Sequence, residues 1–234
     1  MANATAPKQL VILASQSPRR AAILQALGVQ FVVSMSDAEE NSTYPEPQHV
    51  AQLLLLTGSL DENPAIRAWR KGNHIATLHP NAVILAADTI VVCDTQVLNK
   101  PTDAGDAVRM LQLLSGRTHM VHTGIALFLP HQQPRLSIQT SEVQMRTLHD
   151  SEIRTYVSTG EPKDKAGAYG IQGMAGSLVQ AVQGSFTNVV GLPMHTTSTL
   201  LQEAGIAVPI DVADAYENWR LAHPLLRSEL GSEP

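Results

Sequence analysis

Short apolar runs alternate with amphipathic segments along most of the chain. Runs rich in Val, Ile, Leu and Ala are typical of buried strands, and apolar positions three or four apart are typical of helices that cover a sheet. The expected strands are residues 10–14, 30–34, 82–87, 90–93, 118–129 and 135–147, of which the last two form a hairpin through residues 131–134. The expected helices are residues 18–27, 48–56, 64–79, 104–114, 151–159, 195–205 and one segment after residue 206.

Residues with strong capping preferences mark several helix ends. Ser17 fits an N-cap because Pro18 follows it at the first helical position, and Gly28 fits the residue that ends this helix. Asp103 and Asp150 are expected to cap two later helices. Because helices alternate with strands and two strands form a hairpin, we predict an α/β fold with a mixed sheet and flanking helices.

The composition restricts the kinds of partner. The 234 residues fit one α/β domain, and the 44% hydrophobic content argues against disorder. The net charge of −5 gives no overall field that attracts nucleic acid, so an anion site has to come from local clustering. Cys93 is the only cysteine, which excludes an internal disulfide. Because residues 1–9 lack a signal pattern and the apolar runs are too short to span a bilayer, we expect a cytoplasmic protein with no membrane or nucleic-acid partner.

The segment from Ser15 to Arg20 joins the first strand to the first helix. Free N–H groups and the helix dipole favour an anion at such a helix start. The hydroxyl groups of Ser15 and Ser17 and the guanidinium groups of Arg19 and Arg20 add further donors. On its own, the segment fits an ordinary capped helix with exposed arginines equally well.

Asp88 follows a buried apolar run and precedes Thr89, so we expect it to end a strand. Ligands bind beside strand ends in open sheets, where a carboxylate can hold a metal ion or take a proton from water. An aspartate in an ordinary turn is the alternative. An acidic cluster in an earlier loop also fits either a solvated surface or Mg²⁺ coordination, and it consists of Asp37, Glu39 and Glu40.

The region after Gly160 is rich in glycine and contains two lysines. Glycine recurs at every third position from Gly167 to Gly176, in a segment that we expect to form loops with short strands. Such a backbone can pass close to a ligand, or it can be a plain flexible loop. Lys165 lies just before Gly167, and Lys100, earlier in the chain, precedes Pro101. At such positions an ammonium group is either solvated or held near a polyphosphate. His119 and His122 are three apart on a strand, point to opposite faces and are interpreted as structural.

Four longer segments resemble one family, the Maf-like nucleoside triphosphate pyrophosphatases. They are LASQSPRRAAILQALG (13–28), AADTIVV (86–92), LNKPTDAGDAVRMLQLLSGRTHMVHTG (98–124) and YVSTGEPKDKAGAYGIQGMAGSLVQAVQGSFTNVVGLP (156–193). The resemblance implies a twisted mixed sheet with two lobes around a cleft, similar to inosine triphosphate pyrophosphatases. It further implies hydrolysis of a nucleoside triphosphate to the monophosphate and pyrophosphate, with Mg²⁺, Mn²⁺ or Co²⁺ as the divalent ion.

The same resemblance implies roles for individual residues. Asp88 matches the catalytic proton acceptor, which also contacts the metal ion, and Glu40 is the better match to the second metal-side acid, with Glu39 as the alternative. Thr89, Gln172 and Arg19 match the positions that set base preference, and Gln172 resembles the branch that acts on dTTP and UTP. The remaining residues that match substrate-binding positions are Ser15, Ser17, Arg20, Lys71, Lys100 and Lys165.

The chain departs from the family pattern in three places. Asn99 stands where the family usually has glycine, residues 57–69 resemble an insertion, and residues 206–234 form a tail beyond the pattern. We therefore divide the chain into an arm (1–9), a domain (10–205) and this tail. The alternative function is a nucleotide- or nucleic-acid-binding regulator of cell division without turnover, and a homodimer is one option for the assembly.

Overall fold

The computed structural model describes residues 10–35 and 61–223. Their centre is one seven-stranded mixed sheet with the order β2-β1-β3-β5-β6-β7, and β4 pairs with β3 beside this path. β1, β2 and β3 are parallel, and the remaining pairings are antiparallel. The strands are β1 (Val11–Ala14), β2 (Phe31–Val33), β3 (Val83–Cys93), β4 (Gln96–Leu98), β5 (Thr118–Phe128), β6 (Arg135–Met145) and β7 (Val179–Gln183).

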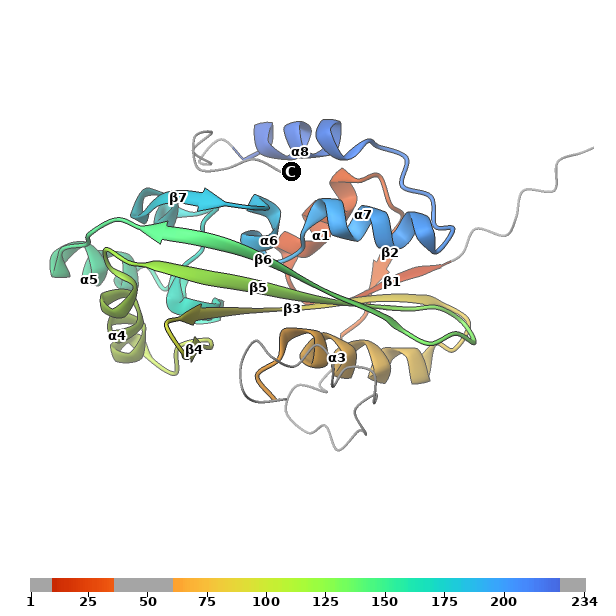
Figure 1. Cartoon of the computed structure of the whole chain (residues 1–234), viewed down its shortest axis with the longest axis horizontal. Coiled ribbons are helices and arrows are strands. Elements are labelled where there is room, and N and C mark those ends of the chain that lie inside the picture. The colour runs from red at the N-terminus through yellow and green to blue at the C-terminus, as the bar shows by residue number, and fades with distance from the viewer. Residues whose placement is uncertain (1–9, 36–60, 224–234) are drawn as a thin grey trace, which may run out of the picture.

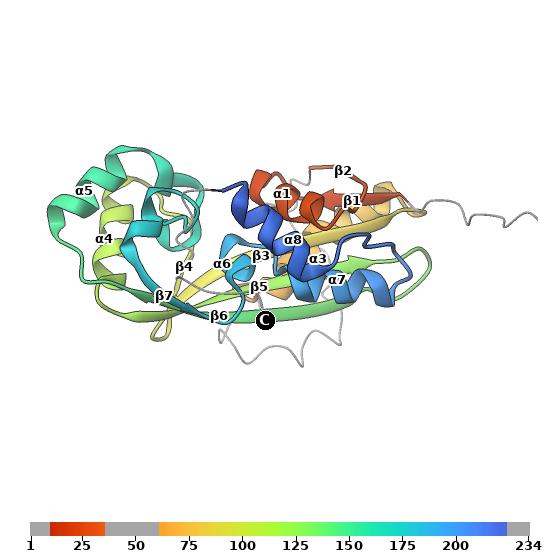
Figure 2. The same ribbon diagram turned by 90° about the horizontal axis from the view of Figure 1, so that it is seen from above.

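Helices cover both faces of the sheet and gather into two lobes (Figures 1 and 2). α3 (Pro64–Leu78) lies on one face, while α1 (Pro18–Ala26), α6 (Phe186–Val190), α7 (Met194–Glu203) and α8 (Val212–Leu221) lie on the other. α4 (Ala104–Leu114) and α5 (Asp150–Ser158) pack against each other at the far end of the long strands. Three short 3₁₀ helices complete this end: η2 (Glu161–Asp164), η3 (Ala166–Ala168) and η4 (Met174–Leu178).

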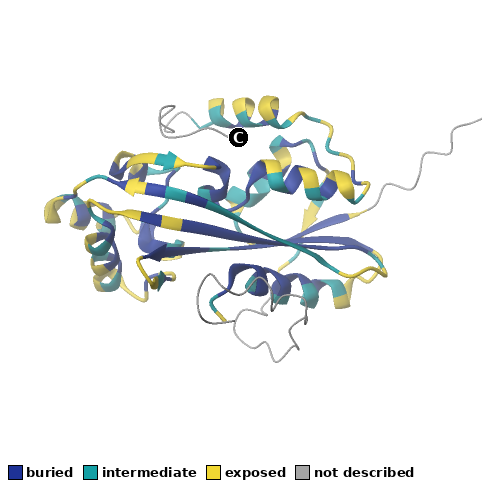
Figure 3. Ribbon diagram, viewed as in Figure 1, coloured by how far each residue is buried: buried dark blue, intermediate teal, exposed yellow. Residues whose placement is uncertain are grey.

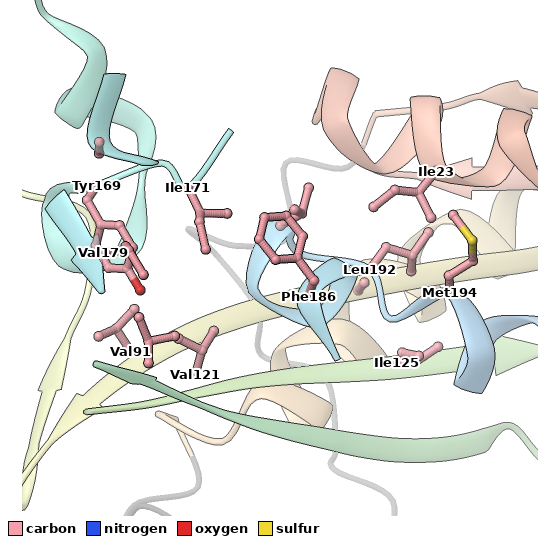
Figure 4. Close-up of a cluster of buried hydrophobic side chains, with 14 of the residues drawn as sticks. Ile23, Val91, Val121, Ile125, Tyr169, Ile171, Val179, Phe186, Leu192 and Met194 are labelled. Atoms are coloured by element: carbon pink, nitrogen blue, oxygen red, sulfur yellow. The ribbon is translucent and has the colours of Figure 1, made fainter. Parts of the chain in front are cut away.

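Successive residues of the central strands enter opposite apolar layers, which explains why β1 and β3 are buried along most of their length (Figure 3). Odd-numbered positions such as Leu13 and Leu85 join the layer under α1, and even-numbered positions such as Ile12 and Ile84 join the layer under α3. The first layer continues from Ile23 through Phe186 to residues of the glycine-rich region, including Tyr169 and Ile171 (Figure 4). The same alternation later determines which way the polar residues of β3 point.

The prediction that Asp88 ends a strand is wrong. The two expected strands 82–87 and 90–93 form the single strand β3, and Asp88 and Thr89 lie in its middle. The long antiparallel neighbour β5 accounts for this continuity, because Asp88 pairs with Gly124 and Thr89 with Thr123 in an unbroken register. A local pair of polar residues therefore did not interrupt the strand, since pairing with a distant segment holds it.

Most other expected elements are confirmed, with two corrections. The Ser17 cap, the start of α3 at Pro64, the Asp103 cap and the hairpin of β5 and β6 lie as expected. Asp150 is the first residue of α5 rather than its cap, and the backbone N–H of His149 donates to the carboxylate of Glu152 instead (2.9 Å). Residues 160–193 contain 3₁₀ turns and the short helix α6 besides one strand, so the expectation of loops with several short strands is wrong. The expected helix 48–56 lies outside the described residues.

α8, in the segment after residue 206, packs against α1 and α7. Trp219 is 2% exposed and joins the same apolar layer as Leu24 and Phe186. The described part of this segment therefore contributes to the core rather than standing apart from it. None of the helices in the described ranges is long and apolar enough to cross a membrane.

Candidate active site

A gap beside β3 opens the sheet to ligands. On the side of β3 away from β5, β1 pairs with residues 83–86 and β4 pairs with residues 91–93. Within the described residues, nothing pairs with residues 87–90 along this edge. A cavity of about 1030 Å³ lies here, and both Asp88 and Thr89 line it although they point to opposite faces. The strand that ends at this cavity is therefore β1. From its end, the chain continues through Ser15 into α1.

Positive charge dominates this cavity. Its lining includes seven basic residues, namely Arg19, Arg20, Arg67, Arg70, Lys71, Lys100 and Lys165. It includes three carboxylates, namely Asp61, Asp88 and Asp164. Because the whole chain carries a net charge of −5, the basic lining is a local feature of the kind that binds an anion.

Asp88 and Lys71 form a buried ion pair at the centre of the cavity wall. Lys71 Nζ donates to Asp88 Oδ1 at 2.6 Å, and the two residues are 8% and 9% exposed. The other oxygen, Asp88 Oδ2, is buried and accepts no hydrogen bond from the residues that the structure describes. The close approach of α3 makes the pair possible, because a Cβ atom on Gly124 would collide with the backbone of Pro64 and Ala65.

Arg20 is fixed by neutral acceptors on the opposite face of β3. Its Nε donates to the carbonyl oxygen of Gly191 (2.8 Å), and its Nη1 and Nη2 donate to the hydroxyl groups of Ser15 (3.1 Å) and Thr89 (3.2 Å). Thr89 in turn bonds to the hydroxyl of Thr123 (2.9 Å). These contacts orient the guanidinium group, which lines the cavity.

Asp164 lies between two of the predicted phosphate-binding cations. Its carboxylate accepts from Lys165 Nζ (2.7 Å) and lies 3.6 Å from Arg19 Nη1. Burial raises the pKa of Asp164, but the hydrogen bond from Lys165 and the charges of Lys165 and Arg19 outweigh burial, so the pKa lies below its ordinary value. Asp164 is therefore ionised at neutral pH and occupies a position that suits another anion.

The glycine-rich loop is braced from behind. Tyr156 donates to Glu161 Oε1 (3.0 Å) and accepts from the backbone N–H of Gly170 (3.2 Å), while the N–H of Met174 donates to Glu161 Oε2 (3.2 Å). A Cβ atom on Gly173 would collide with the Glu161 carboxylate, which explains glycine there. The brace holds both ends of the segment that carries Gln172.

Gln172 and Tyr169 line the cavity from this loop. Gln172 Oε1 is buried and has no hydrogen-bond partner among the described residues, which is costly unless a ligand supplies one. The Tyr169 hydroxyl bonds to Nε2 of the buried His119 (2.7 Å), and burial lowers the pKa of His119 to about 4. His119 is therefore a neutral support behind the cavity wall, as the sequence interpretation expected, and His122 bonds to Thr140 (2.8 Å) on the other face.

The predicted site residues come together with one exception. Asp88 and all of the predicted substrate-binding residues line the cavity: Ser15, Ser17, Arg19, Arg20, Lys71, Thr89, Lys100, Lys165 and Gln172. Glu40 and its alternative Glu39 lie outside the described residues. In the parts that are described, no group of three or more His, Cys, Asp or Glu side chains lies close enough together to hold a metal ion by itself.

Sequence reasoning missed several cavity residues on α3 and in the loop. Arg67 and Arg70 line the cavity from the face of α3 that carries Lys71, and Asp61 and Asp164 line it as counter-charges. The spacing of Arg67, Arg70 and Lys71 at i, i+3 and i+4 was an available signal, because such residues share one face of a helix. Treating residues 57–69 as an insertion concealed it.

Comparison with known proteins identifies the family of the chain and several similar proteins. Residues 10–204 match the Maf-like protein family. A protein of Myxococcus xanthus named dTTP/UTP pyrophosphatase is 44% identical over 204 residues, which cover 87% of this chain and 97% of that protein. A protein of Symbiobacterium thermophilum with the same name is 40% identical over 201 residues, which cover 86% and 96%. Among solved structures, a nucleoside-triphosphatase (dITP/XTP pyrophosphatase) of Mycobacterium abscessus aligns with 58% of this chain and 73% of its own, at 16% identity and a TM-score of 0.36.

Proposed function

This chain belongs to the Maf-like protein family, and we propose that it is a nucleoside triphosphate pyrophosphatase that hydrolyses dTTP or UTP to the monophosphate and pyrophosphate. Modified pyrimidine triphosphates are further candidate substrates, because the recognised part of the base can be common to them. The relatives that carry the same activity in their names align over nearly their whole length.

The observation that carries the proposal is a lone carboxylate oxygen inside a basic cavity. Asp88 Oδ2 accepts no hydrogen bond, while Lys71 holds Oδ1 of the same carboxylate. The seven basic residues of the lining provide the charge that a triphosphate requires. An oriented base beside a polyphosphate site supports attack by water on phosphorus.

In this mechanism Asp88 Oδ2 takes a proton from a water molecule as the water oxygen attacks the α-phosphorus. The bond between the α-phosphorus and the oxygen that bridges to the β-phosphorus breaks, pyrophosphate leaves with the bond electrons, and the proton is later released to solvent. Lys71 holds the carboxylate in place (2.6 Å). Arg20, Lys100 and Lys165 bind the phosphate oxygens and stabilise the negative charge that develops on the leaving pyrophosphate.

The residues fit a divalent metal ion, and we propose Mg²⁺, with Mn²⁺ or Co²⁺ able to replace it. Asp88 Oδ2, which accepts no hydrogen bond from the described residues, is a hard oxygen of the kind that such ions prefer, and it has one lone pair for the ion and another for the water proton. Glu40 is the proposed second acid, and phosphate oxygens and water would complete the coordination. When bound, the ion supplies positive charge to the phosphates.

We propose that the side-chain amide of Gln172 recognises the base by hydrogen bonds. A thymine or uracil ring presents carbonyl acceptors and one N3–H donor, and an amide can both accept and donate. The buried Oε1 of Gln172 has no partner within the described part of the chain and can accept from N3–H. A guanine edge presents two donors and favours a carboxylate at this position. We therefore propose that the amide selects pyrimidines.

Product analysis tests the proposed function. The purified protein with Mg²⁺ and dTTP or UTP should release the monophosphate and pyrophosphate, separated by ion-exchange chromatography, with no diphosphate. Orthophosphate as the first product would exclude attack at the α-phosphorus. Binding of the nucleotide without any product would instead favour the alternative of a regulator without turnover.

A further inference from the structure

Arg67 is a cavity residue that the mechanism above does not use. It lies on the fourth position of α3, one turn before Lys71, and its side chain is 28% exposed. Its Nε donates to the backbone oxygen of Asp61 (2.7 Å), and its Nη1 donates to the side-chain oxygen of Asn99 (2.8 Å). Two acceptors from different parts of the chain therefore fix the plane of its guanidinium group.

Both of these acceptors are neutral. Among the described residues, the nearest carboxylate oxygen is Asp88 Oδ2 at 3.9 Å, which is a long ion pair but not a hydrogen bond. The neighbouring cations differ, because Arg70 donates directly to the Asp61 carboxylate (2.8 Å) and Lys71 donates to Asp88 (2.6 Å). Arg67 is thus oriented by the protein while its charge remains available to an anion.

Neutral oxygens orient both Arg67 and Arg20, which lie on the two faces of β3. Arg20 is oriented by the neutral oxygens of Gly191, Ser15 and Thr89. Arg67 lies beside Asp88, which points to the other face. A phosphoryl group in front of Asp88 and Thr89 would therefore have one guanidinium group on each side.

We propose that Arg67, held in position by its hydrogen bond to Asn99, binds a non-bridging oxygen of the α-phosphoryl group. This inference rests on the proposed function. The position next to Asp88 favours the α-phosphoryl group over the leaving pyrophosphate, because in-line attack places the water and the leaving group on opposite sides of the phosphorus. A glycine at position 99 would offer no side-chain oxygen to aim Arg67, so Asn99 and Arg67 act as a unit.

Kinetics of Arg67→Ala, Arg67→Lys and Asn99→Ala test this role. For Arg67→Ala we expect kcat/KM for dTTP to fall about 10²–10³-fold, the usual loss for one donor to developing charge. Arg67→Lys keeps the positive charge but loses the planar set of guanidinium N–H donors, so its kcat/KM should lie between those of wild type and Arg67→Ala. Asn99→Ala should lower kcat/KM less than Arg67→Ala does. Arg117→Ala is the matched control, because Arg117 pairs with Asp94 outside the cavity (3.1 Å) and should leave kcat/KM unchanged.

Product inhibition identifies which phosphate Arg67 contacts. The monophosphate keeps the α-phosphoryl group, so Arg67→Lys should weaken inhibition by dTMP about tenfold and leave inhibition by pyrophosphate unchanged. Weaker inhibition by pyrophosphate alone would overturn the assignment to the α-phosphoryl group. Arg67→Lys and Asn99→Ala enzymes with wild-type kcat/KM would overturn the inference itself. A wild-type protein that releases no pyrophosphate would refute the proposed function first, so the two failures are distinguishable.

Discussion

The two ends of the cavity are built from different kinds of backbone. At the proposed phosphate end, Asp88 lies in the middle of an eleven-residue strand and Lys71 in a fifteen-residue helix. At the proposed base end, Gln172 lies between short 3₁₀ turns that are braced by Tyr156 and Glu161. The first end is held by sheet pairing and close helix packing, and the second is held by a few side-chain hydrogen bonds.

This difference indicates how the two parts of the reaction are separated. Water attack needs a base fixed to within a fraction of an ångström, which regular elements provide. Base recognition requires only that one amide faces the ligand, and a braced loop is sufficient for that. Changes at the phosphate end should therefore affect turnover on every substrate, whereas changes in the loop should affect the choice of substrate.

Asp88→Asn is the strongest test of the phosphate end. Replacing the proposed base by an amide should lower kcat by about 10²–10⁴-fold, which is the usual contribution of general base catalysis. The loss should be equal for dTTP and UTP, while calorimetry should show that dTTP still binds, because the basic lining remains. A variant with near wild-type kcat would move the base to another residue.

The neutral His119 behind the loop predicts a stability effect with a defined sign. Its pKa is about 4 in the folded protein and about 6.5 when unfolded, so the unfolded chain binds the extra proton between these values. The contribution of this group is fully present above pH 6.5 and declines as the pH falls toward 4, by about 3 kcal/mol in all. His119→Gln should make the decline in unfolding free energy shallower in urea titrations. The exposed His131→Gln is the control, and an unchanged slope in His119→Gln would contradict burial of the neutral ring.

Gln172→Glu should change selectivity rather than overall turnover. A carboxylate facing a pyrimidine carbonyl leaves a buried polar group without a partner, which should cost about 1–3 kcal/mol in kcat/KM for dTTP and UTP. The fall for GTP should be smaller, or GTP should be used better. Equal losses on all three triphosphates would show that Gln172 only supports the loop.

Glu161→Gln should have the smallest effect, because it loosens the brace without touching the substrate. One or two hydrogen bonds to Tyr156 and Met174 weaken, at about 1 kcal/mol each, so we expect a severalfold rise in KM for dTTP with little change in kcat. Glu152→Gln is a matched control. That carboxylate also accepts a backbone N–H and a side-chain donor, but these come from His149 and Arg146 rather than from the brace of the loop. The same change in both variants would mean that the brace has no special connection with the base end.

Local signals were sufficient for the parts of the fold that local chemistry determines. Ser17 with Pro18 predicted the start of α1, and the apolar pattern predicted the hairpin of β5 and β6. The place of Asp88 within β3 was not predicted, because it depends on pairing with β5 some 35 residues later. The resemblance to a family identified the site residues that line the cavity, whereas spacing alone left each of them open.

The contacts that refine the site could not be predicted from sequence. Arg67 meets Asn99 across 32 residues, and Glu161 meets Met174 across a loop whose path depends on glycines. No periodic pattern in the sequence indicates such pairs, because each depends on how two separate segments of the chain pack against each other. The orphaned oxygens of Asp88 and Gln172 are likewise visible only once every neighbour is placed.

Hydrolysis in ¹⁸O-labelled water tests the central claim most directly. If Asp88 directs water to the α-phosphorus, mass spectrometry after a single turnover on dTTP with Mg²⁺ will find one ¹⁸O atom in the monophosphate and none in pyrophosphate. The label should stay in the monophosphate in every variant that retains activity. Label in pyrophosphate, or in free orthophosphate, would show that water attacks a different phosphorus and would contradict the account.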